Sequence, residues 1–203
     1  MVEESKRYRS ILMFGYPGCG KGTQGVVLGR MPNLVHLAMG DIFRGLDPKS
    51  DIGKEFLSYS TKGMLVPDEL TIRVFRHHLQ GHAQAGAIDP DYHTLLLDGI
   101  PRTTQQVQLL ANVIDVKKII YLMMDDRDAL VARLAGRAAK QNRPDDADRE
   151  VILNRIEVYE RETSPVLKAY PKKLIARVNA DQAPLAVLRD AADCLIDVVP
   201  AGI

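Results

Sequence analysis

The sequence lacks most features that mark secreted, membrane-spanning or zinc-stabilised proteins. Only two cysteines, Cys19 and Cys194, occur among 203 residues, and no cluster of cysteine and histidine has the spacing of a zinc site. The first residues are charged and include no apolar segment of signal-peptide length, and no apolar run approaches the ~20 residues of a membrane span. We therefore expect a cytoplasmic protein in a reducing compartment, without cysteine-ligated zinc.

An excess of charge of one sign is also absent. The chain has 27 basic and 26 acidic residues and a net charge of +1, so its bulk charge favours neither nucleic acid nor a membrane surface as a partner. Its length suits one sizeable core with small inserts. No internal repeat is visible, and the guanine-reading motif Asn-Lys-x-Asp does not occur, which disfavours a generic GTPase.

The most informative stretch is residues 11–24, where an apolar run leads into a glycine-rich loop and then a helical pattern. The spacing Gly15-x4-Gly20-Lys21 is that of a phosphate-binding loop, although Gly22 stands where serine or threonine is expected. Glycines allow successive N–H groups to face an anion, and a helix N-terminus adds partial positive charge. A simple turn with a surface lysine is the alternative, but the flanking strand and helix favour a phosphate site.

Apolar runs alternate with helical patterns along the chain. Strands are predicted at residues 9–14, 34–38, 93–97, 117–124 and 174–178. Helices are predicted at residues 22–31, 68–80, 103–113, 126–139, 147–169 with a break at Pro165, and 184–197. Continuous apolar strands between helices are typical of a parallel sheet that is covered on both faces. We expect an α/β fold with a five-stranded parallel sheet, a loop at residues 81–92, and polar inserts at about residues 39–67 and 136–146.

Charged residues follow the predicted strand ends, where open parallel sheets bind ligands. Asp98 follows a buried strand and could hold waters around Mg²⁺, although a turn aspartate is the alternative. Arginine binds phosphate bidentately, so arginines that converge on one cleft would suit ligands with many phosphates. The candidates are Arg44, Arg102, Arg133, Arg137, Arg143 and Arg155. We assign Arg127 and Arg149 to the solvated surface. Asp145 and Asp146 could cap a helix, hold the polar loop closed or touch a ribose.

These blocks resemble the nucleoside monophosphate kinases, and among them the short-form adenylate kinases. The matching blocks are residues 15–24, 40–44, 63–68, 97–102, 133–137 and 143–155, in the family's order over nearly the whole chain. The ending Gly-Lys-Gly-Thr of the loop is the family's own variant, which accounts for Gly22. The resemblance implies reversible phosphoryl transfer from MgATP to AMP, giving two ADP, by a monomer whose lid binds no zinc.

The resemblance also implies a domain organisation and a set of site residues. The core would comprise residues 1–37, 68–135 and 147–203, with a mobile monophosphate-binding insert at 38–67 and a short mobile lid at 136–146. The implied ATP contacts are Gly18, Cys19, Gly20, Lys21, Gly22, Thr23, Arg133, Arg137 and Gln182. The implied AMP contacts are Met39, Arg44, Met64, Leu65, Val66, Gly99, Ile100, Pro101, Arg102, Gln106, Arg143 and Arg155. The implied catalytic residues are Lys21, Arg102, Arg137, Arg143 and Arg155. Asp98 would contact Mg²⁺ through water, and Asp145 and Asp146 would support lid closure.

Two positions bear on which base is accepted. Gln106 stands where adenylate kinases carry the glutamine that reads adenine, and this favours AMP over UMP or CMP. Met39 replaces the family's usual threonine beside the base, and this keeps a UMP/CMP or broad-specificity kinase open as the alternative. Ile100 replaces an aromatic residue, a change expected to affect packing. A non-catalytic nucleotide sensor is disfavoured, because it would not need Lys21, Asp98 and the full set of arginines.

Overall fold

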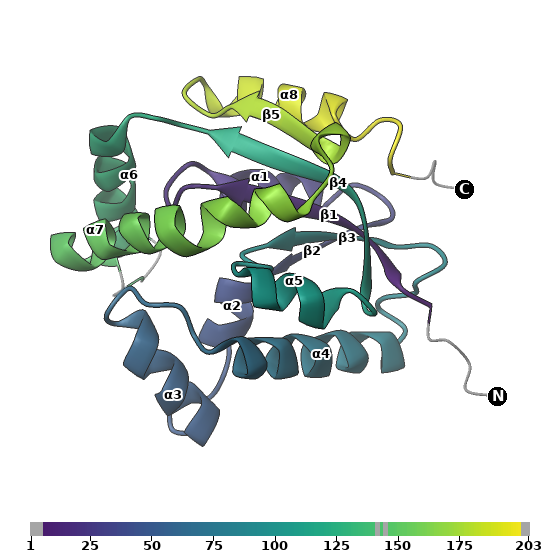
Figure 1. Cartoon of the computed structure of the whole chain (residues 1–203), viewed down its shortest axis with the longest axis horizontal. Helices are drawn as coiled ribbons and strands as arrows, with labels where there is room; N and C mark the ends of the chain where they lie inside the picture. Colours follow the sequence, from purple (N-terminus) through teal and green to yellow (C-terminus); the bar gives the residue numbers. More distant parts are fainter. Residues whose placement is uncertain (1–5, 141–142, 144–145, 200–203) are drawn as a thin grey trace.

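A five-stranded parallel sheet organises the fold of the computed structural model, which describes residues 6–140, 143 and 146–199 (Figure 1). The strands lie in the order β2-β3-β1-β4-β5 and every pair is parallel. Their bounds are β1 (Tyr8–Gly15), β2 (Leu34–Ala38), β3 (Thr94–Asp98), β4 (Ile114–Met123) and β5 (Ile175–Asn179). The predicted sheet is therefore confirmed.

Both faces of the sheet are apolar, because successive side chains of a strand point to opposite sides. Ile11 and Met13 of β1 belong to one buried cluster, and Leu12 and Phe14 belong to the other. This explains why the strands are continuous apolar runs rather than alternating ones.

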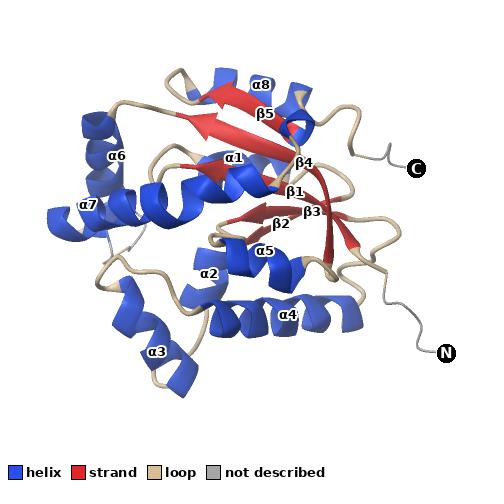
Figure 2. Cartoon of the chain, in the orientation of Figure 1, coloured by secondary structure: helices blue, strands red, loops and turns tan. Residues whose placement is uncertain are grey.

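Helices cover both of these faces (Figure 2). One cluster includes residues of α1 (Lys21–Leu28), α6 (Arg127–Lys140), α7 (Arg149–Val158) and α8 (Pro184–Asp193). The other includes residues of α2 (Met39–Arg44), α4 (Asp68–Gln84) and α5 (Thr104–Leu110). Helix α3 (Asp51–Ser60) lies beyond α2, next to α4 in Figure 1. Within the described residues, no helix combines the length and the apolar character needed to cross a membrane.

The predicted boundaries are wrong by the largest margin in three helices; α1 and α5 also end three residues early, and β4 begins three residues before its predicted start. Helix α4 continues through Gly81 to Gln84, because a helix tolerates one exposed glycine at a cost of about 1 kcal/mol. Gly86, which has a φ of 70°, follows the end of this helix. The helix predicted over 147–169 stops being α-helical at Val158. A π-helical turn (Tyr159–Thr163) and a 3₁₀ segment (Ser164–Ala169) follow it, and the second contains Pro165. The last helix ends at Asp193 rather than 197.

Candidate active site

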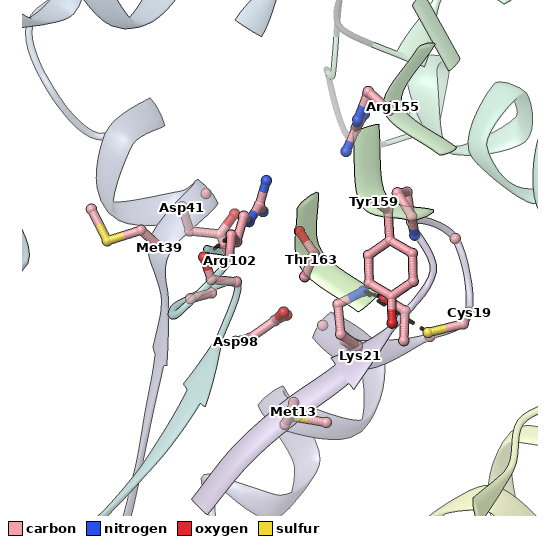
Figure 3. Close-up of a pocket in the computed structure, with 18 of the residues that line it drawn as sticks. Met13, Cys19, Lys21, Met39, Asp41, Asp98, Arg102, Arg155, Tyr159 and Thr163 are labelled. Atoms are coloured by element: carbon pink, nitrogen blue, oxygen red, sulfur yellow. Dashed lines mark hydrogen bonds between the residues drawn. The ribbon is translucent and has the colours of Figure 1, made fainter. Parts of the chain in front are cut away.

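A cleft of about 1220 Å³ lies at the carboxyl ends of the strands. Ligand pockets commonly measure about 300–1,000 Å³, so this cleft has room for more than one small ligand. In Figure 3, Met39, Asp41 and Arg102 lie on one side, and Lys21, Cys19 and Tyr159 lie on the other, with Asp98 and Thr163 between them. The cleft therefore lies where the parallel sheet predicts it.

The glycine-rich loop between β1 and α1 forms one wall of the cleft. Gly20 has a φ of 105°, which favours glycine, and a Cβ built there would meet no described atom within 4 Å. Gly15 also has a left-handed φ, but a Cβ there would lie only 2.6 Å from Cys19 Sγ and from the carbonyl oxygen of Leu122. The loop is thus packed tightly at its start and open at the N-terminus of α1, where an anion can approach.

Lys21 folds back across this loop. Its Nζ donates hydrogen bonds to the carbonyl oxygens of Gly15 at 2.7 Å and Tyr16 at 3.0 Å. Cys19 is buried behind the loop, and this burial raises the pKa of its thiol, although nearby Lys21 acts to lower it. A ligand would therefore meet the main chain of Cys19 rather than a reactive thiolate.

Asp98 ends β3 in the centre of the cleft. Its neighbours in register are Ala38 on β2 and Met13 on β1, and its Oδ2 lies 3.9 Å from where a Cβ of Gly22 would be. Asp98 and Thr23 both line the cleft and offer the oxygen donors that Mg²⁺ prefers. No group of three potential metal-ligating side chains occurs among the residues that the structure describes. These residues fit a magnesium ion that keeps several waters and phosphate ligands.

The structure brings the predicted arginines together. The cleft is lined by Arg44, Arg102, Arg133, Arg137, Arg143 and Arg155. Arg127 instead pairs with Glu160 at 3.3 Å, and neither it nor Arg149 belongs to the described lining. The cleft is therefore strongly positive, although the chain as a whole is nearly neutral.

Two carboxylates hold four of these arginines. Asp41 Oδ1 accepts from Arg44 at 2.6 Å and from Arg143 at 3.1 Å. Burial acts to raise the pKa of Asp41, but the hydrogen bond and charge of Arg44 and the charge of Arg143 outweigh it and hold that pKa below its ordinary value. The contact between Asp41 and Arg143 also joins α2 to the segment between α6 and α7.

Asp146 is the second of these carboxylates. It is fully buried, and it accepts from Arg137 Nε at 2.8 Å and from Arg155 Nη1. The capping interpretation is wrong for this residue, because Asp148 caps α7 by accepting from the main-chain N–H of Glu150. These ion pairs tie Asp146 to Arg137 of α6 and to Arg155 of α7. Asp145 lies outside the described residues.

Apolar residues form the wall near α2. Met39 is buried at the start of α2, and Phe43 stacks on Phe56 with ring centroids 5.0 Å apart. Both rings line the cleft, together with Met64, Leu65 and Val66. The phenylalanines are not among the residues expected at the site, although Phe43 lies within the Gly40–Arg44 block.

A hydrogen-bonded cluster links α4 to α5 at the same end. Gln106 Oε1 accepts from the main-chain N–H of Arg102 at 2.7 Å, and Gln106 Nε2 donates to Asp68 Oδ1 at 2.8 Å. Thr103 Oγ1 donates to the other carboxylate oxygen of Asp68, also at 2.8 Å. The Arg102 guanidinium donates from Nε to the carbonyl oxygen of Gly99 at 3.0 Å.

Comparison with known proteins decides what kind of site this is. A family model described as adenylate kinase matches residues 13–175. The chain belongs to the adenylate kinase family.

Several adenylate kinases match this chain over most of its length. The adenylate kinase of Kocuria rhizophila is 35% identical over 83% of this chain and 89% of its own length. The adenylate kinase of Synechococcus sp. is 34% identical over 92% of this chain and 95% of its own. That of Clavibacter michiganensis is 38% identical over 80% of each chain. These matches confirm the resemblance inferred from the motifs.

Three residues of this adenylate kinase family member bear on the expected contacts. Ile100 is an expected AMP contact, but it is buried in the core and does not appear in the described lining, which agrees with the expected effect on packing. Gln182 lines the cleft, and its side chain donates to Asp190 Oδ2 at 2.7 Å. Tyr159 is not among the expected contacts; it is buried, but it also lines the cleft.

The π-helical turn brings two further side chains to the phosphate loop. Tyr159 and Thr163 stand at its ends, and both line the cleft beside Lys21 (Figure 3). The Tyr159 ring packs on Tyr16, with centroids 4.7 Å apart. Such turns often occur at functional sites, but the sequence shows no signal for one beyond the nearby Pro165.

Proposed function

We propose that the protein transfers the terminal phosphoryl group of MgATP reversibly to AMP, giving two ADP, as a cytoplasmic monomer. The main support, beside family membership, is that Lys21 and six arginines of the described chain line one cleft. Two polyphosphate ligands placed end to end would carry many negative charges. A cluster of cations in an otherwise nearly neutral protein suits the binding of such ligands.

The cleft divides into a donor side and an acceptor side. The glycine-rich loop, Arg133 and the main chain of Gln182 suit ATP, while Arg44, Arg102 and the wall around Met39 suit AMP. Arg137, Arg143 and Arg155 come from the segment that joins α6 to α7 and from its flanking helices. We propose that these three arginines reach the transferring phosphoryl group between the two nucleotides.

Alignment and charge neutralisation supply the chemistry. The acceptor is a phosphate oxygen that is already ionised, so no side chain has to remove a proton. Lys21 exchanges its carbonyl partners, Gly15 and Tyr16, for phosphate oxygens. Thr23, and Asp98 through water, would hold a magnesium ion, which supplies further charge neutralisation at the donor phosphates.

Closure of the two inserts, residues 38–67 and 136–146, would complete the site. The ion pair of Asp41 with Arg143 joins these two segments, and Asp146 pairs with Arg137 within the second insert and with Arg155 of α7 outside it. We propose that the carboxylates keep the arginines in place until phosphates arrive. A closed site would exclude water, which would otherwise compete with AMP as the acceptor.

A coupled assay with MgATP and a panel of acceptors tests this function. AMP is expected to have the highest kcat/KM, followed by dAMP, with CMP and UMP far below. The buried Met39 keeps a broader specificity as the second candidate, and a kcat/KM for CMP or UMP equal to that for AMP would establish it instead. Nucleotide binding without turnover would indicate a sensor.

A further inference from the structure

The carboxamide of Gln106 is held at both ends, and Asp68 holds one of them. Its oxygen accepts from the main-chain N–H of Arg102 at 2.7 Å, and its nitrogen donates to Asp68 Oδ1 at 2.8 Å. Gln106 is 2% exposed, and it lines the cleft on the proposed AMP side. The side chain expected to read the base is therefore already positioned before a nucleotide binds.

The two partners leave this carboxamide only one orientation. A main-chain N–H can only donate, and an ionised carboxylate can only accept. Turning the amide over would set its N–H₂ group against the Arg102 N–H and its oxygen against the Asp68 carboxylate. Two like groups would then face each other at each end, so the order of donor and acceptor is fixed.

Asp68 is itself held in place. It is the first residue of α4, and its second oxygen accepts from Thr103 Oγ1 at 2.8 Å. Thr103 caps α5 by accepting from the main-chain N–H of Gln106 at 3.1 Å. The carboxylate is therefore anchored to the same turn as the glutamine that it orients.

The held carboxamide retains one N–H and one lone pair of electrons for a ligand. Adenine presents an exocyclic amino donor next to a ring-nitrogen acceptor, and hypoxanthine presents an oxygen acceptor next to a ring N–H donor. A fixed donor–acceptor order pairs with one of these edges and opposes the other. An opposed edge leaves buried polar groups unpaired, and this is how sites reject close analogues strongly.

We propose that Asp68 is a positioning residue for base selection, which rests on the function proposed above. By fixing the orientation of Gln106, it selects AMP over IMP. Asp68 need not touch the nucleotide, because it acts through the amide that does.

The test compares D68N with E69Q by steady-state kinetics with AMP, IMP and dAMP at saturating MgATP. Both residues are acidic and lie in the first turn of α4, and Glu69 is exposed, so both variants lose the same charge near the helix N-terminus. An asparagine at 68 can present either an oxygen or an N–H₂ group, so residue 68 no longer opposes the turned amide and only the Arg102 N–H does.

D68N should lower the AMP-to-IMP ratio of kcat/KM about 10- to 100-fold, mainly through a lower KM for IMP, because the amide can then turn over without facing a carboxylate, while the Arg102 N–H still favours the AMP-reading orientation. The dAMP-to-AMP ratio should not change, because both share the adenine edge, and E69Q should behave as the wild type. A folded D68N enzyme with an unchanged AMP-to-IMP ratio would overturn the proposal.

Two further comparisons keep the test decisive. If D68N does not fold, D68S takes its place in the test, because a serine hydroxyl can also donate or accept. The AMP-to-IMP ratio of kcat/KM is expected to fall in the same way. An unchanged AMP-to-IMP ratio in D68S would overturn the proposal. Failure of the underlying function appears separately, as absent AMP phosphorylation by the wild type.

Discussion

Replacing the buried carboxylate Asp146 by asparagine should destabilise the protein measurably. Asp146 is fully buried between Arg137 and Arg155, whose side chains are 25% and 19% exposed. Removing one partner of a fully buried ion pair costs about 3–5 kcal/mol. Because water reaches part of each guanidinium and asparagine keeps one acceptor oxygen, we expect about 2–3 kcal/mol for D146N.

Urea unfolding at neutral pH measures this loss. For a chain of this length, about 2–3 kcal/mol corresponds to a Tm lower by about 4–12 °C, and the dependence on urea should keep its slope. D148N is the matched control, because asparagine caps a helix about as well as aspartate and Asp148 caps α7. Saturating ADP should narrow the deficit of D146N, since phosphates would replace the missing charge.

A D146N midpoint that matches both the wild type and D148N would refute this reasoning. It would mean that the arginines are held by the rest of the cleft and that Asp146 contributes no net stability. A deficit that ADP leaves unchanged would instead contradict the proposed replacement of carboxylates by phosphates.

Three further perturbations test the cleft. K21A should reduce kcat by orders of magnitude with little change in Tm, because Lys21 contributes charge at the transition state; a near-native rate in a coupled assay would argue against a catalytic loop. R102A should mainly impair AMP saturation and leave the KM for ATP within a few-fold, and normal AMP kinetics would remove Arg102 from the acceptor site. Asp41 has a lowered pKa in the fold, so its stabilisation is present above its ordinary pKa and disappears as pH falls through the lowered value. D41N should cost under about 1 kcal/mol at neutral pH, with no cost in strong acid, as measured by urea unfolding; a difference independent of pH would contradict this.

The strands and the phosphate loop could be predicted because each depends on a local pattern. Ile11–Phe14 and Leu95–Leu97 are apolar without alternation, and only a sheet covered on both faces buries such runs. The arginines were found through motif spacing rather than composition, since the net charge of the chain gives no hint of a positive cleft.

The pairings inside the cleft could not be predicted in the same way. Asp41 and Arg143 are separated by about half of the chain, and Asp68 and Gln106 lie on different helices, α4 and α5. No local sequence pattern therefore predicts either contact. The pairing of Asp41 with Arg44 is the one that the sequence could have indicated, because residues three apart on a helix lie on the same face. The π-helical turn at Tyr159 was missed because propensity predicts a continuous helix there.

Transfer of label from ATP marked at its γ-phosphate tests the central claim most directly. With AMP and Mg²⁺ present, we expect the label to appear in the β-phosphate of ADP, with two ADP formed for each ATP consumed and little free phosphate. Label that accumulates as inorganic phosphate, or that stays in ATP while both nucleotides bind, would contradict a cleft built to align donor with acceptor.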